Sequence, residues 1–163
     1  MPPATRCALG FRIKSGWATT VLLGGAATAP KVLDRRITLL ADPMDPEARQ
    51  PYHAGLGTHE ARAAGHRVRG VGIVVGSVID PARIPNEHIR AHAEEGRLFR
   101  TVVEQAIRAC RLRAHVMVEK ELYVTAARFR RRVAALGEHV DGPWRAEEKA
   151  AALAAWMVLR SAT

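Results

Sequence analysis

The sequence predicts an α/β fold in which one mixed sheet carries helices on both faces. Three observations predict it. Two apolar segments joined by a tight turn open the chain, a continuous apolar run stands near its middle, and amphipathic helical patterns follow that run. Strands that alternate with helices are typical of parallel pairs joined by right-handed crossovers. A chain of 163 residues suits one domain, which we expect to span 1–163.

The first three predicted strands form an antiparallel meander. Segments 6–13 and 16–25 alternate apolar and polar residues around a turn that ends at Gly16. Segment 30–42 supplies the third strand, with Leu33, Arg35, Ile37 and Leu39 on one face. Pairing of neighbours in the chain then gives an antiparallel half of the sheet.

The later segments alternate between strand and helix. A loop rich in proline at 42–57 is long enough to be functional or mobile. The glycines within 70–76 lie inside a strand, where they allow a helix to approach closely. In order, we expect a helix at 58–66, a strand at 69–80, a long helix capped by Asn86, a strand at 114–120, a helix at 121–136, and a buried helix with Pro143 at its first position.

Charge and cysteine content restrict the environment and the partners. The formal net charge is +9 and the sequence pI is about 10.7, which favours polyanions such as nucleic acid. Because most of the cations are arginine, base composition of the gene is an alternative cause. Two distant cysteines predict a reduced, cytoplasmic protein, and no apolar run is long enough for a membrane helix. Segment 17–29 imitates a secretory signal, but glycines interrupt it and it favours strand.

The order of elements resembles that of the ribonuclease H-like superfamily, which includes ribonuclease H, Holliday-junction resolvases and actin-like ATPases. The stretch LGFRIKSGWATTVLL is similar to their first hairpin, a strand of pattern G-apolar-D-x-G-small followed by a second strand. The stretch EEKAAALAAW resembles the acidic start of the resolvases' last helix. This resemblance implies a three-layer fold around a five-stranded mixed sheet, nucleic acid as partner, and Mg²⁺ or Mn²⁺ as cofactor.

One residue departs from that pattern. Arg12 stands where the family has its first metal-binding aspartate. Two-metal hydrolysis needs several carboxylates around the ions, and a guanidinium at the centre would repel Mg²⁺ and attract anions. The sequence therefore predicts a degenerate metal site.

Acidic residues at the ends of the later strands are the candidate catalytic group. Asp80 and Glu119 each follow an apolar strand, and Glu148 opens the last helix beside Glu147. The carboxyl ends of parallel strands meet at one edge, where ligands bind. Asp80 and Glu148 have simpler explanations as well, because Asp80 suits a turn before proline and acids suit a helix N-terminus. Glu119 is harder to explain in this way, since it lies in a short apolar strand.

Three further groups are candidates for binding. His88, His92 and Glu95 share one helix face and could hold a transition metal, although a polar helix end explains them equally. The first hairpin offers an anion site, and the densest basic run offers a nucleic-acid surface or a solvated helix face. These last two groups are Arg12, Lys14 and Ser15, and Arg128, Arg131 and Arg132.

Three functions are consistent with these features. The first is a nucleic-acid-associated ribonuclease H-like domain with a degenerate metal site, which is not a fully active nuclease. The second is a non-catalytic protein-binding module or homodimer on the same fold. The third is a binder of a small phosphate ligand at the first hairpin.

Overall fold

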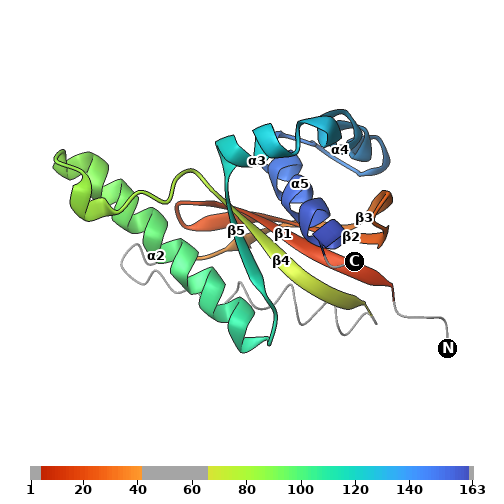
Figure 1. Ribbon diagram of the computed structural model, residues 1–163, viewed down its shortest axis with the longest axis horizontal. Coiled ribbons are helices and arrows are strands. Elements are labelled where there is room, and N and C mark those ends of the chain that lie inside the picture. Colours follow the sequence, from red (N-terminus) through yellow and green to blue (C-terminus); the bar gives the residue numbers. More distant parts are fainter. Residues whose placement is uncertain (1–4, 42–65, 162–163) are drawn as a thin grey trace.

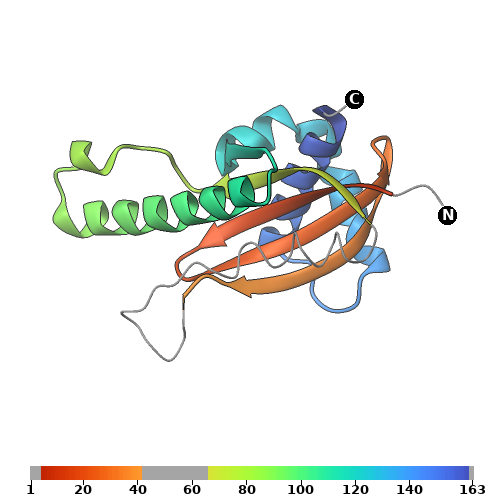
Figure 2. The ribbon, with the colours of Figure 1, turned by 90° about the horizontal axis from the view of Figure 1, so that it is seen from below.

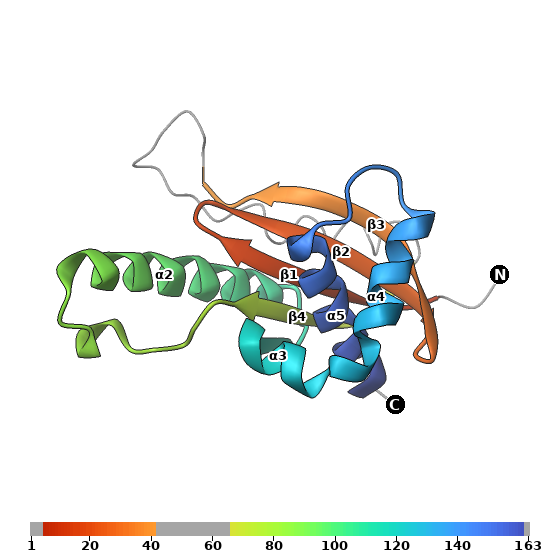
Figure 3. The ribbon, with the colours of Figure 1, turned by 90° about the horizontal axis from the view of Figure 1, so that it is seen from above.

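The computed structural model describes residues 5–41 and 66–161. Five strands form one mixed sheet in the order β3-β2-β1-β4-β5 (Figure 1). Helix α2 covers one face of this sheet and α5 covers the other (Figures 2 and 3). The predicted α/β fold with helices on both faces is confirmed. No helix in the described part of the chain is long and apolar enough to cross a membrane.

The predicted antiparallel meander is confirmed. It consists of β1 (Arg6–Lys14), β2 (Trp17–Ala26) and β3 (Ala29–Leu39), with β2 between the other two. The parallel half adds β4 (Arg67–Val75) beside β1 and β5 (Ala114–Val118) beside β4. The carboxyl ends of β1, β4 and β5 therefore meet at one edge of the sheet, called here the carboxyl edge.

Strand β4 is shorter than predicted. We expected strand as far as Asp80, but β4 ends at Val75. The last pair between β4 and β5 joins Val75 to Val118, and the last pair with β1 joins Val74 to Arg12. Beyond Val75 the backbone has no neighbouring strand to bond, so the chain leaves the sheet.

The helix on the first face begins as predicted. The Asn86 side chain caps α2 (Glu87–Ala109) by accepting a hydrogen bond from the Ile89 N–H at 3.0 Å. A short 3-10 turn, η2 (Pro81–Arg83), precedes it. The buried side chains of α2 are Phe99, Val103 and Ile107, all in its C-terminal half. The N-terminal half extends beyond the ends of β1 and β4 (Figure 3).

The prediction of a single helix at 121–136 is wrong, because the helical structure there is interrupted. The chain there forms three short pieces, α3 (Glu119–Thr125), η3 (Ala127–Phe129) and α4 (Arg130–Leu136), followed by η4 (Gly137–His139). The bend at η3 brings the Phe129 ring to 5.2 Å from that of Trp156. Packing against the last helix therefore decides where the amphipathic pattern breaks.

The last helix, α5 (Ala146–Ser161), starts later than predicted. Pro143 does not open it, because the Trp144 indole donates to the Val133 carbonyl at 2.8 Å and holds that segment against α4. The Glu148 carboxylate accepts from the Arg145 N–H at 2.9 Å and caps the helix there. The expected burial of α5 is confirmed along its alanine-rich length.

Close approach of α5 to the sheet requires glycine in two strands. A Cβ added to Gly10 of β1 would lie 1.8 Å from the Ala151 carbonyl oxygen. A Cβ on Gly72 of β4 would lie 2.8 Å from the Ala154 Cβ. The prediction that the glycines of this strand admit a closely packed helix is confirmed for Gly72.

Candidate functional site

Three glutamates gather at the carboxyl edge, and each lies beside a cation of the protein. Glu119 is the first residue of α3, directly after β5. Glu147 and Glu148 lie in the first turn of α5, which crosses the same strands. Their partners come from the antiparallel half of the sheet and are Arg12, Lys14 and Arg35.

The pair between Arg12 and Glu119 is the most buried of the three. The Arg12 side chain lies on the α5 face, as strand alternation predicts, and the residue is only 7% exposed. Its Nη2 lies 2.7 Å from Glu119 Oε2 and its Nε lies 3.2 Å from Oε1. Its Nη1 donates to the Ile13 carbonyl at 2.6 Å. This two-pronged geometry fixes both side chains.

A second pair joins the end of β1 to the start of α5. Lys14 Nζ lies 3.4 Å from Glu147 Oε1. The pKa of Glu147 is lowered, first by a hydrogen bond from its own backbone N–H and then by Lys14 and Arg12, while burial opposes this shift. The N-terminus of α5 thus holds this carboxylate ionised next to the β1 cations.

The third pair involves a residue that sequence reasoning did not select. Arg35 of β3 stands opposite Val21 and therefore faces α5. Its Nη1 lies 3.4 Å from Oε1 of the buried Glu148, and its Nη2 donates to the Asp141 carbonyl at 2.9 Å. The alternation in segment 30–42 contained this signal, because it placed Arg35 on a face with three large apolar residues.

The predicted catalytic acids do not form one cluster. Glu119 binds Arg12 and Glu148 binds Arg35, whereas Asp80 accepts from the Ala82 N–H at 3.2 Å and caps η2. Within 5–41 and 66–161, no group of three or more His, Cys, Asp or Glu side chains is arranged to hold a metal ion. A catalytic role for Asp80, Glu119 and Glu148 remains a prediction.

The histidine group lies on the exposed N-terminal half of α2. The Nε2 atoms of His88 and His92 are 3.2 Å apart, and His92 Nδ1 is 3.7 Å from Glu95 Oε2. Glu95 also accepts from the Ser15 hydroxyl at 3.1 Å. Among the described residues, no three His, Cys, Asp or Glu side chains are arranged to hold a metal ion. Metal binding by His88, His92 and Glu95 therefore stays a prediction.

The three hairpin residues selected for anion binding already face carboxylates. Arg12 binds Glu119, Lys14 binds Glu147, and Ser15 donates to Glu95. An incoming anion would therefore have to compete with these groups. Within the described structure, the polar side chains at the first hairpin therefore serve as partners of the protein's own carboxylates.

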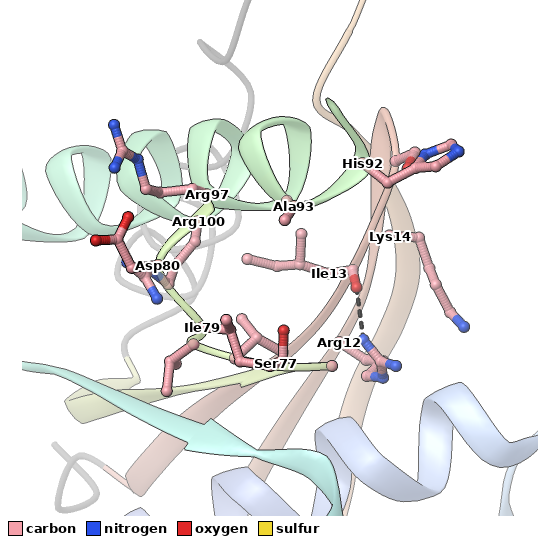
Figure 4. A pocket seen from close by; sticks show the side chains of 15 residues that line it. Arg12, Ile13, Lys14, Ser77, Ile79, Asp80, His92, Ala93, Arg97 and Arg100 are labelled. Carbon is pink, nitrogen blue, oxygen red and sulfur yellow. Dashed lines mark hydrogen bonds between the residues drawn. The ribbon is translucent and has the colours of Figure 1, made fainter. Parts of the chain in front are cut away.

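Two basic cavities flank the paired acids. The first, called here the α2 cavity, has a volume of about 470 Å³ and lies between the ends of β1 and β4 and the side of α2 (Figure 4). The second, called here the α4 cavity, measures about 420 Å³ and lies between α3, α4 and α5. Their cations include Arg97 and Arg100 in the first, and Arg130, Arg131 and Lys149 in the second.

The α4 cavity includes only part of the predicted basic patch. Arg131 lines the cavity, whereas the Arg128 guanidinium lies 4.9 Å from the centre of the Phe129 ring. Arg132 is exposed on α4. Tyr123 also lines the cavity, and burial together with the Glu119 carboxylate raises the pKa of its hydroxyl. The hydroxyl is therefore held in its protonated, hydrogen-bond-donating form.

Comparison with known proteins identifies the fold. No protein-family model matches the chain, and no curated protein matches it. RuvC of Thermus thermophilus bound to a Holliday junction substrate matches with a TM-score of 0.67 at 10% identity, over 96% of this chain and 93% of that one.

Two further solved structures agree. T. thermophilus RuvC in another structure gives a TM-score of 0.61 at 11% identity, over 96% and 93% of the two chains. The yeast mitochondrial Holliday junction resolvase Ydc2 gives 0.53 at 9% identity, over 98% and 82%. The chain has the ribonuclease H-like fold of these resolvases, as the order of its elements predicted.

Proposed function

We propose that this chain is a nucleic-acid-binding domain that binds without a metal ion and is not a fully active nuclease. One observation carries the proposal. At the end of β1, where the resemblance implies a metal-binding aspartate, the buried Arg12 forms a two-pronged ion pair with Glu119. In this proposal, the Arg12 guanidinium occupies the position that a metal ion would take beside Glu119.

The charge balance of the carboxyl edge supports a metal-independent role. Metal-assisted phosphodiester hydrolysis needs carboxylates that are available to the ions. Glu119, Glu147 and Glu148 each have a cation within 3.4 Å. A metal ion would have to displace a buried guanidinium and leave its charge without a partner, which is costly in a protein interior.

The remaining cations favour a polyanionic partner. The net charge is +9, and the two basic cavities lie on either side of the paired acids. Lysine and arginine contacts to phosphates bind nucleic acid without reading its sequence. Because the fold matches RuvC bound to a Holliday junction substrate, a four-way DNA junction is the first ligand to test.

The test is a binding titration with a fluorescent four-way junction, a duplex and a single strand. We expect binding at low salt that is equal in EDTA and in Mg²⁺, and affinity that falls steeply as salt rises. Incubation with Mg²⁺ or Mn²⁺ should yield no cleaved strands. Absence of binding at low salt, or cleavage that depends on the metal, contradicts the proposal.

A matched pair of variants localises the interface. Removing three charges from the α4 cavity (Arg130→Gln, Arg131→Gln, Lys149→Gln) should weaken binding and reduce the slope against salt by about one for each lost phosphate contact. The control is Lys31→Gln, an exposed cation of β3 whose residue pairs with Gly24, far from the carboxyl edge. If Lys31→Gln loses as much binding affinity as each charge removed from the α4 cavity, an interface at the carboxyl edge is contradicted.

A protein-binding or homodimeric module is the second candidate, because four large apolar side chains are exposed near the N-terminal half of α2. They are Val78, Ile79, Ile89 and Leu98. Light scattering in high salt distinguishes the two functions. A dimer that persists there and is lost in Ile89→Ser/Leu98→Ser would favour this second function, whereas a monomer would contradict its homodimeric form.

A further inference from the structure

The α2 cavity has the size of a small-ligand site and walls from three parts of the chain. Its volume of about 470 Å³ falls within the usual range of such sites, roughly 300–1,000 Å³. The end of β1, the segment that follows β4, and the side of α2 form its walls (Figure 4).

Cations stand at two ends of this cavity. Arg12 and Lys14 lie at one end, and Arg97 and Arg100 lie at the other, beside Asp80 (Figure 4). The first two already bind Glu119 and Glu147. Arg100 is also paired, with Glu104 at 3.4 Å, so Arg97 is the cation of the described lining that has no acidic partner. It lies at the α2 end, away from the first hairpin where the sequence predicted an anion site.

The two α2 arginines have unused hydrogen-bonding capacity. The Nε–H of Arg100 is buried and has no hydrogen-bond acceptor in the described structure. Glu104 Oε1 lies 3.4 Å from this Nε, but the geometry is not that of a hydrogen bond. Arg97 forms no ion pair or side-chain hydrogen bond with any described residue, and it lies one turn before Arg100. A buried N–H without an acceptor is a costly arrangement that a ligand oxygen would relieve.

The other groups of the cavity suit the rest of a nucleotide. Apolar side chains of Ile13, Ile79 and Ala93 lie between its two ends (Figure 4). Ser77 and His92 add polar atoms to the lining. The single carboxylate of the lining, Asp80, already accepts from the Ala82 N–H. A flat, mostly apolar ring would fit between the cationic ends.

We infer that the α2 cavity binds a nucleotide through its phosphate monoester, with Arg97 and Arg100 donating to the phosphate oxygens. The planar guanidinium forms paired hydrogen bonds to phosphate, and a monoester carries more charge than the diester of a strand interior. The base lies over Ile13 and Ala93. Binding at this site does not depend on the proposed nucleic-acid function, because a mononucleotide can occupy the cavity without any bound strand.

The test is a calorimetric titration of the full chain with adenosine 5′-monophosphate, adenosine and inorganic phosphate. We expect the monophosphate to bind at least about 10-fold more tightly than adenosine. Arg97→Gln and Arg100→Gln should each lose about 10-fold in affinity, while Lys31→Gln, the exposed control cation of β3, should bind as the wild type does. Asp80→Asn should tighten phosphate binding, because it removes the nearby negative charge.

Other outcomes overturn the inference. Equal binding of the monophosphate and adenosine, no binding of either, or equal losses in the Arg97 and Lys31 variants would each do so. Arg97 is exposed, so its variant should fold even where that of Arg100 does not. A chain that binds the four-way junction but no mononucleotide overturns this inference alone, and the reverse result overturns only the proposed function.

A second arm identifies the source of the phosphate. Short oligonucleotides with and without a 5′-phosphate are used as competitors of the mononucleotide. Competition by the phosphorylated strand alone assigns the site to strand ends. Competition by neither strand assigns it to free nucleotides.

Discussion

The two faces of the sheet are covered in different ways. On one face, α5 packs so closely that glycine is required in β1 and β4, and its alanines are buried along most of its length. On the other face, only the C-terminal half of α2 is buried, and the rest extends beyond the carboxyl edge. The α5 face also holds the glutamates paired with Arg12, Lys14 and Arg35, whereas on the α2 side Arg97 has no ion-pair partner among the described residues.

This difference indicates that the α5 face mainly stabilises the fold, whereas the extended half of α2 has surface that is available for binding. On the α5 face, a change in side-chain volume or charge should lower the stability of the fold, because the packing is tight and the ion pairs are buried away from solvent. The extended half of α2 is free of that restriction. Arg97, which lies in this half and has no ion-pair partner among the described residues, can meet a ligand without first breaking an interaction of the fold.

Gly10→Ala should produce the largest effect. The added methyl group would lie 1.8 Å from the Ala151 carbonyl oxygen, which belongs to the backbone of α5 and cannot turn aside. We expect the free energy of unfolding to fall by about 3 kcal/mol or more, measured by urea denaturation. Wild-type stability in this variant would show that α5 can move off the sheet, and the contrast between the two faces would fail.

Glu119→Gln should come next. It leaves the Arg12 guanidinium buried without its carboxylate, a loss of about 3–5 kcal/mol for fully buried pairs. Because the Glu119 side chain is 31% exposed, we expect about 2 kcal/mol.

The matched control for this pair lies on the other face. Glu87→Gln breaks the pair with Arg90, in which the Glu87 side chain is 91% exposed, and should cost less than about 1 kcal/mol. Equal losses in the two variants, measured by thermal denaturation, would remove the distinction between the buried and the exposed pair.

Gly96→Ala should have the opposite sign. Gly96 lies within α2, and a Cβ added there meets no atom of the described residues within 4 Å. Alanine favours the helix over glycine, so the free energy of unfolding should rise by about 0.5–1 kcal/mol. A decrease of similar size would mean that the extended half of α2 is packed against part of the protein.

The smallest effect is expected from pH at Glu147. Its pKa is lowered from the model-peptide value of 4.5, first by its own backbone N–H. The native state therefore binds its proton less readily than the unfolded state, and this stabilisation is complete above about pH 4.5 and lost as the pH falls through the native pKa.

Unfolding of the wild type and Glu147→Gln is compared from about pH 7 to about pH 2.5. The difference should shrink on acidification. Glu94→Gln, on the exposed side of α2, controls for the loss of one carboxylate. A difference that stays constant would contradict a role for this charge at the start of α5.

Local patterns sufficed to predict most of the sheet and the place of Arg12. Period-two alternation placed Arg12 and Lys14 on one face of β1, and the Asn86 cap marked the start of α2. These features depend on residues next to each other in the chain. For the same reason, the carboxyl edge could be predicted to hold Glu119 and the acids of the last helix.

The features that sequence reasoning missed depend on contacts between distant residues. The helix expected at 121–136 breaks so that Phe129 can reach Trp156, and α5 starts late because Trp144 is held by α4. Likewise, nothing near Arg35 in the chain indicates Glu148, which is its partner only after folding. The helix predicted at 58–66 lies largely outside the described residues, and the loop predicted at 42–57 lies entirely outside them.

The Trp156 indole donates to the Ala27 carbonyl, at the turn between β2 and β3, at 2.8 Å. This hydrogen bond joins the last helix to the turn between β2 and β3, 129 residues earlier in the sequence. The helix also packs on β1, β2 and β4. During synthesis these strands leave the ribosome long before α5 exists, so their α5 face stays uncovered until translation reaches that helix. Such long-range closure slows folding and leaves the nascent sheet open to association until α5 covers it.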